Sequence, residues 1–301
     1  MACRYQIVPT GYFILSLHAR FGRVTLKGVG QVMLQENSWT GLLFLVGLAF
    51  SSIYLVSLAL VATILATLFA YLVKYPEERI EQGLYGYNAT LVGIGCGLFM
   101  EPSLLATILF VALSILSAVV THWGMRQKYL PVLTAPFVLL LWGLILFVLY
   151  VDPPLHLHSF TYPTTLGNTP LVIFGVGLGQ VMLQANALTG YLFLLGILVN
   201  SPRAVAYLVV GSLLTFLLCL FPFVDTIDAH SGLYLYNTIL VAIVVSGKPR
   251  RFAPWALLGG TILSFFIQYL GLSMGISTLT APFVLVVWIL NGVERWVRTR
   301  S

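Results

Sequence analysis

The chain has 301 residues, of which 59% are hydrophobic and only 8% are charged. Soluble globular proteins carry about a quarter charged residues, so this chain cannot cover its surface with polar groups in water. The composition excludes a soluble globular protein and indicates an integral membrane protein, with no soluble domain large enough for separate chemistry.

Apolar stretches follow one another along the chain, and we expect an all-α protein that crosses the bilayer with them. They form two sets of five, at residues 25–50, 53–73, 83–100, 103–123 and 131–150, and at residues 171–199, 204–222, 232–246, 253–272 and 278–294. We assign residues 1–150 to a first half, residues 151–170 to a linker outside the cytoplasm, and residues 171–301 to a second half.

Basic residues mark one side of this arrangement. When the N-terminus is placed in the cytoplasm, all fifteen Lys and Arg residues fall on the cytoplasmic side, as the positive-inside rule requires. The opposite side receives Asp152, Asp225 and Asp228 and no basic residue. The pattern predicts a multi-pass protein with both termini in the cytoplasm, and it explains the net charge of +6 without a nucleic-acid partner.

The chain contains three cysteines, Cys3, Cys96 and Cys219, which share no close spacing. This pattern predicts neither a metal site nor a disulfide, and we expect no cofactor.

Three phrases occur twice, once in each half. Gln31–Gly47 and Gln180–Gly196 share 12 of 17 residues, and "GLYGYNATLV" at 83–92 matches "GLYLYNTILV" at 232–241 in 7 of 10. "LTAPFVLLLW" at 133–142 matches "LTAPFVLVVW" at 279–288 in 8 of 10. A repeat with five crossings enters the membrane from opposite faces, which makes it an inverted repeat. Such folds place their binding or permeation site near the midplane, between the halves.

Helix packing is the other explanation of the first phrase, because Gly and Thr allow close contact between helices in lipid. That explanation accounts for the glycines. It accounts poorly for the glutamines Gln31, Gln35, Gln180 and Gln184, because an unpartnered amide in hydrocarbon costs about 4–8 kcal/mol on the cyclohexane scale. An interrupted helix that lines a pore fits them better, and Asn37 and Asn186 are the natural candidates for the breaks.

The doubled "GQVMLQxNxxTG", "GLYxYNxxLV" and "LTAPF" resemble the urea transporter family, over residues 28–288. The resemblance implies a homotrimer with one pore in each protomer. It also implies ten spanning helices and two re-entrant half-membrane helices, one in each half.

The resemblance further implies a narrow slot that binds urea. Gln31 and Gln180 match glutamines whose oxygens accept from urea at the two outer sites, and Thr134 and Thr280 match threonines at the middle. The apolar walls match the four residues Val32, Val181, Leu91 and Leu240. The chain departs from many members at four further positions of this expected site, where Phe is common and it has Leu34, Leu183, Tyr87 and Tyr236. These replacements leave open whether formamide, acetamide or thiourea also passes.

Residue chemistry alone favours a passive facilitator. Neutral amide and hydroxyl groups can replace the water around urea without holding it tightly. The main alternative is an ion-coupled secondary transporter of a small amide, which would normally carry acids within its spans; here only Glu36 lies at an expected break. Asn88 and Asn237 are expected either to line the slot or to hold broken backbone. No catalytic motif occurs, so we expect a transporter, not an enzyme, in a bacterial inner membrane and surrounded by lipid.

Overall fold

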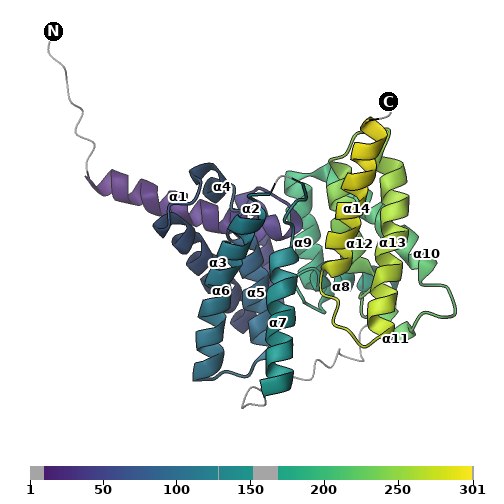
Figure 1. Ribbon diagram of the computed structural model, residues 1–301, viewed down its shortest axis with the longest axis horizontal. Coiled ribbons are helices and arrows are strands. Elements are labelled where there is room, and N and C mark those ends of the chain that lie inside the picture. Colours follow the sequence, from purple (N-terminus) through teal and green to yellow (C-terminus); the bar gives the residue numbers. More distant parts are fainter. Residues whose placement is uncertain (1–9, 128, 152–168, 300–301) are drawn as a thin grey trace, which may run out of the picture.

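The computed structural model describes residues 10–127, 129–151 and 169–299, and its regular structure there is helical throughout (Figure 1). The first half contains α1 (Thr10–Gly30), the 3-10 turn η1 (Gln31–Met33), α2 (Ser38–Ser51), α3 (Ile53–Leu72), α4 (Glu77–Glu81), α5 (Tyr87–Phe99), α6 (Leu104–Gly124) and α7 (Ala135–Val151). The second half contains α8 (Pro170–Gln180), α9 (Ala187–Asn200), α10 (Pro202–Leu218), α11 (Thr226–His230), α12 (Leu235–Ser246), α13 (Ala253–Ser273) and α14 (Ala281–Arg298). The predicted linker at 151–170 lies almost wholly outside the described residues.

Helices of the two halves follow in the same order, and three of the equivalent pairs are equal in length. The pairs α2 and α9, α4 and α11, and α6 and α13 have 14, 5 and 21 residues each. The helices that open the two halves differ in length: α1 has 21 residues and α8 has 11. The internal repeat read from the sequence is therefore matched by a repeated order of helices.

The two stretches that carry the Gln-rich phrase, 25–50 and 171–199, are each two helices and not one. Leu34 and Leu183 adopt left-handed backbone conformations, with φ of 61° and 60°, which end the preceding helical turn. Asn37 then caps α2 by accepting from the N–H groups of Trp39 and Thr40, and Asn186 caps α9 by accepting from that of Thr189. The breaks lie where the asparagines suggested.

Helices α2 and α9 join the two halves. The Thr40 hydroxyl donates to the Gly196 carbonyl at 2.7 Å, and the Thr189 hydroxyl donates to the Gly47 carbonyl at 2.8 Å. The rings of Phe44 and Phe193 pack between them with centroids 5.0 Å apart. Each contact has its counterpart at the equivalent position of the other half, and small glycines allow the helices this close approach.

The exterior of the bundle suits lipid. The helices α3, α6 and α13 are long and apolar enough to cross a membrane, and α2, α5, α7, α8, α9, α10 and α12 are shorter apolar helices. Large apolar side chains face outward; Leu104 is 79% exposed, and Trp123 and Trp255 are 72% and 75% exposed near helix ends. Tryptophan is enriched at membrane interfaces. The chain is an all-helical integral membrane protein, as its composition predicted.

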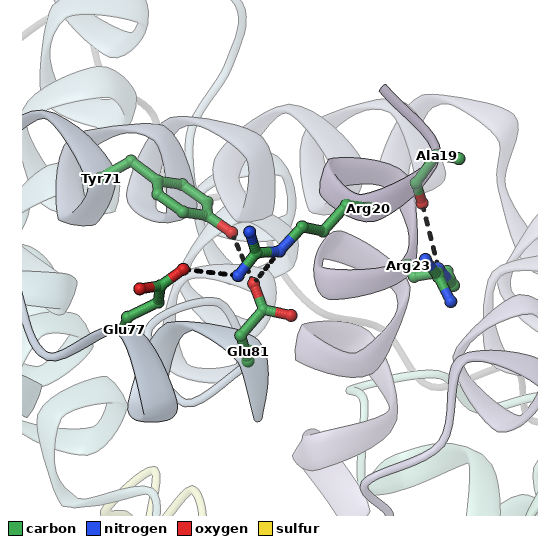
Figure 2. A network of polar contacts seen from close by, with 6 residues as sticks. All are labelled: Ala19, Arg20, Arg23, Tyr71, Glu77 and Glu81. Carbon is green, nitrogen blue, oxygen red and sulfur yellow. Dashed lines mark hydrogen bonds and ion pairs between the residues drawn. The ribbon is translucent and has the colours of Figure 1, made fainter. Parts of the chain in front are cut away.

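An ion-pair network fixes α1 against the short helix α4 (Figure 2). The Arg20 guanidinium contacts Glu77 at 2.5 Å and Glu81 at 2.8 Å, and the Tyr71 hydroxyl donates to Glu81 at 3.0 Å. Arg23 turns instead to the Ala19 carbonyl of its own helix, at 3.4 Å. The network holds the middle of α1 against α4.

Candidate functional site

The first glutamine of each repeated phrase is held by one half of its amide. Gln31 donates from Nε2 to the Gln82 carbonyl at 3.0 Å, and Gln180 donates from Nε2 to the Ser231 carbonyl at 3.1 Å. The acceptors are themselves 149 residues apart, as are the donors. Within the described residues neither Oε1 forms a hydrogen bond, so each amide keeps an acceptor free for a ligand.

Tyr87 and Asn88 hold the chain just before α7. The Tyr87 hydroxyl donates to the Leu133 carbonyl at 2.6 Å, and Asn88 donates from Nδ2 to the same carbonyl at 3.3 Å. The Asn88 Oδ1 accepts from the Phe137 N–H at 3.2 Å, which satisfies an amide at the start of α7. Of the two roles considered for Asn88, the structure favours holding the broken backbone.

The second half repeats this arrangement before α14. The Tyr236 hydroxyl donates to the Leu279 carbonyl at 2.7 Å, Asn237 donates to the same carbonyl at 3.2 Å, and its Oδ1 accepts from the Phe283 N–H at 3.1 Å. Tyr87 and Tyr236, two positions of the predicted site, therefore position backbone with their hydroxyl groups.

Four leucines around the site have left-handed backbone conformations. Leu34 and Leu183 have φ of 61° and 60°, and Leu133 and Leu279 both have φ of 49°. A positive φ is unfavourable for a bulky residue, and such strain persists only where surrounding contacts impose it. The four strained positions occur as two repeat-related pairs, each beside a predicted site residue or at one.

The central threonines meet. The hydroxyl oxygens of Thr134 and Thr280 lie 2.7 Å apart, although 146 residues separate them in sequence, and each side chain is 3% exposed. Thr134 precedes α7 and Thr280 precedes α14. The hydrogen bond puts the starts of these two helices next to each other at the junction of the halves.

A crossed pair of tryptophans closes the same junction. Trp142 of α7 donates from Nε1 to the Ser277 carbonyl at 2.7 Å, and Trp288 of α14 donates from Nε1 to the Pro131 carbonyl at 2.8 Å. Each tryptophan ends one copy of the LTAPF phrase and reaches the backbone that precedes the other copy. This explains why Trp is the last matched residue of both copies.

The four expected wall residues, Val32, Val181, Leu91 and Leu240, are all at most 1% exposed. They belong to one large apolar core that runs through both halves. Their burial is that of core residues, as expected for apolar wall positions.

A cavity of about 310 Å³ lies where α8 ends, beside α12 and the α13–α14 connection. Gln180, Leu183 and Tyr236, three residues of the predicted site, line it together. Leu98 and Phe99 contribute from the first half, and the others are Asp228, Leu233, Gln268, Leu272 and residues 275–279. The cavity therefore combines an apolar wall with a few convergent polar groups, as small-molecule sites do.

Gln268 was missed from sequence. It is 1% exposed in α13, and its Oε1 accepts from Thr278 at 2.7 Å and from Asn237 at 3.0 Å. An amide within an otherwise apolar stretch was the available signal, because such a group is retained only where partners satisfy it. Gln268 and Asn237 together fix the backbone that carries Thr280.

Gln35 and Gln184, the second glutamines of the phrase, have a structural role. Gln35 donates to the Met33 carbonyl at 2.8 Å and Gln184 to the Met182 carbonyl at 3.1 Å. The Gln35 Oε1 also accepts from Asn200 at 2.8 Å. Of the four glutamines, Gln35 therefore has both ends of its amide bonded, whereas Gln31, Gln180 and Gln184 keep an amide oxygen that accepts no hydrogen bond among the described residues.

The repeat-equivalent positions on α4 and α11 differ in charge. Asp228 of α11 corresponds in the repeat to Arg79 of α4, 149 residues earlier, and Arg79 donates to the Met125 carbonyl at 3.4 Å. Burial and the neighbouring charge of Asp225 raise the pKa of the Asp228 carboxyl above its usual value. Within the described residues no three His, Cys, Asp or Glu side chains are placed to hold a metal ion.

These features define a class: a helical membrane transporter whose polar groups meet where its two halves join. The chain belongs to the urea transporter family, whose model, described as "Urea transporter", matches residues 23–295. The chain is similar to Urea transporter 1 of Ovis aries, with 29% identity over 294 residues, 86% of this chain and 73% of that protein. Urea transporter 1 of Rattus norvegicus is 29% identical over 276 residues, 83% of this chain and 69% of that protein. Family membership makes the chain a transporter and not an enzyme, as its sequence predicted.

Proposed function

We propose that this protein conducts urea passively, down its gradient, through a narrow slot between its two halves. The observation that carries the proposal is the hydrogen bond between Thr134 and Thr280. Gln31 and Gln180, one in each copy of the repeat, each have an amide oxygen without a hydrogen bond among the described residues. Urea is planar, neutral and rich in N–H donors. Acceptors at each end and hydroxyls at the middle replace the water molecules that hydrate urea. Because these groups are neutral, they bind urea weakly enough for it to dissociate and move on.

The slot we propose is built from twelve residues. Gln31 and Gln180 accept from urea at the ends, Thr134 and Thr280 bond it at the middle, and the others shape the walls: Val32, Val181, Leu34, Leu183, Tyr87, Tyr236, Leu91 and Leu240. In the described structure the threonines bond each other. A passing urea would exchange that bond for bonds to itself, at little net cost, because hydroxyls both donate and accept.

The proposal includes an inverted repeat of residues 1–150 and 171–301. In Figure 1, α14 rises toward the end marked C, whereas α7 descends toward the lower edge of the view. Figure 1 also has α4 at the upper end of the first half and α11 at the lower end of the second. Arg79 on α4 has the acidic residue Asp228 as its repeat equivalent on α11, and the positive-inside rule favours basic residues on one membrane face only. We also propose that the segments broken near Asn37 and Asn186 are the re-entrant parts.

Basic residues support the orientation that we propose, with both termini in the cytoplasm of a bacterial inner membrane. Arg203 of α10 donates to the Lys248 carbonyl at 3.3 Å, and the Lys248 ammonium contacts Glu294 of α14 at 2.6 Å. These basic residues therefore gather with the C-terminal end of α14. A homotrimer with one pore in each protomer completes the proposal, and the exposed apolar sides of the bundle provide surface for lipid and for neighbouring protomers.

An ion-coupled carrier has less support. Glu36, the acid at the first helix break, is 47% exposed and contacts Lys27 at 3.0 Å, which is the setting of a surface ion pair. The test is urea flux into proteoliposomes with and without ionophores. A channel gives flux above that of protein-free vesicles that collapsing ion gradients does not change. Flux that disappears with the gradients overturns the passive mechanism, and no flux overturns the substrate.

A further inference from the structure

Asp228 is a carboxylate whose charge the proposed urea path does not require. It lines the 310 Å³ cavity with Gln180 and Tyr236, and it is neither fully buried nor fully exposed. In the part of the chain that the structure describes, Asp228 forms no ion pair. A cavity with an uncompensated negative charge attracts a cation that fits it.

Short connections fix Asp228 relative to Gln180. Asp225 caps α11 by accepting from the N–H groups of Ile227 at 2.8 Å and Asp228 at 3.1 Å. Three residues after Asp228, the Ser231 carbonyl accepts from the Gln180 amide at 3.1 Å. The same seven-residue segment therefore carries the carboxylate and anchors the amide, whose Oε1 is left as a second acceptor in the cavity.

Two acceptors, one of them charged, match a planar cation with N–H groups on several arms. Guanidinium has the trigonal planar shape of urea, with a third amino group in place of the carbonyl oxygen and one positive charge. Hydrogen bonds to an ionised partner are about twice as strong as neutral ones. We propose that guanidinium-type cations bind in this cavity at Asp228 and block the urea path without crossing it; this inference rests on the proposed function.

The guanidinium-type cation does not pass beyond the cavity, because no acidic side chain of the described residues at the junction of the halves compensates its positive charge. The groups at the junction of the halves are the hydroxyls of Thr134 and Thr280 and the carbonyls of Leu133 and Leu279, and the carbonyls are already bonded. A charged group in an apolar path is costly where no opposite charge accompanies it. The other end of the path offers no equivalent site, because Arg79 stands where Asp228 stands in the repeat.

The experiment measures urea flux by stopped flow in proteoliposomes with millimolar guanidinium chloride on both sides, against equal sodium chloride. Each inhibition is expressed relative to the unblocked flux of the same variant. We expect guanidinium to slow the wild-type protein and the half-inhibiting concentration to rise about tenfold in Asp228→Asn. Asp228→Glu should keep the block. Asp225→Asn is the matched control, because it removes the same charge one turn away, and Asn also caps helices.

Three results overturn the inference: no block of the wild-type flux, an equal half-inhibiting concentration in wild type and Asp228→Asn, or labelled guanidinium that enters as fast as urea. If the Asn variant does not assemble, Asp228→Ser replaces it. Wild-type protein without any urea flux would instead contradict the proposed function, so the two failures are distinguishable.

Discussion

The hydroxyl of Tyr87 donates to the carbonyl of Leu133 at 2.6 Å and holds that leucine in a left-handed conformation directly before Thr134. In Tyr87→Phe this carbonyl keeps only the longer bond from Asn88, at 3.3 Å. We expect the variant to lose about 1 kcal/mol of stability and to conduct urea several-fold more slowly, because Thr134 is less well placed. Thermal unfolding in detergent and stopped-flow flux measure the two effects. Tyr54→Phe, at an exposed tyrosine, is the control, and equal behaviour of both variants would remove Tyr87 from the positioning role.

Gly190 tests the close contact between α8 and α9. A Cβ added there would lie 1.7 Å from the Gly175 carbonyl oxygen, whereas one added at Gly143 has nothing within 4 Å. Overpacking of this kind typically costs about 1–3 kcal/mol, so Gly190→Ala should unfold at a lower temperature or fail to assemble. Gly143→Ala should be as stable as the wild type. Size-exclusion elution and thermal unfolding compare them, and a stable Gly190→Ala protein would contradict the described contact.

Gln180 tests the end of the path. Replacing it with Leu removes the free amide oxygen from the cavity and leaves the Ser231 carbonyl without its donor. One neutral hydrogen bond is worth about 1 kcal/mol, so urea flux should fall roughly five- to tenfold. The elution profile shows whether the variant is assembled. An assembled Gln180→Leu protein with wild-type flux would exclude Gln180 as a urea acceptor.

The guanidinium block should depend on pH. Burial and then the charge of Asp225 raise the pKa of Asp228, so its carboxylate is present above that raised pKa and is lost as pH falls through it. The block should therefore weaken on acidification, at a higher pH than for an ordinary aspartate. Titratable groups near Asp228 include Asp225, which caps α11, His230 at the end of α11, and Tyr234 directly before α12. Half-inhibiting concentrations measured across pH, with Asp225→Asn as reference, test this; a block that strengthens on acidification would contradict it.

Much of the fold could be predicted, because apolar stretches and repeated phrases are both visible in the sequence itself. Eight of the apolar stretches correspond to one helix each, from α3 to α14. The stretches at 25–50 and 171–199 are interrupted near Asn37 and Asn186, as the sequence indicated, but a run of apolar residues does not reveal the left-handed conformations of Leu34 and Leu183. The short helices α4 and α11 were missed, since five polar-rich residues have no helical period to detect.

Less of the site could be predicted from the sequence, because its contacts join residues that lie far apart along the chain. The paired motifs identified Thr134 and Thr280, yet nothing local indicates that their hydroxyls meet, or that Trp142 and Trp288 cross between the halves. Tyr87 and Tyr236 also hold backbone with their hydroxyl groups, and these hydrogen bonds become visible only in three dimensions. The inverted topology and the slot itself stay predictions.

The central claim is that urea crosses between the halves at the threonine pair, and urea flux through Thr134→Val combined with Thr280→Val tests it most directly. Valine keeps the shape of threonine, and replacing both partners leaves no buried hydroxyl unpaired, so the fold should persist. The account predicts that the assembled double variant conducts urea at least about tenfold more slowly than the wild type. An assembled double variant with unchanged urea flux would contradict it.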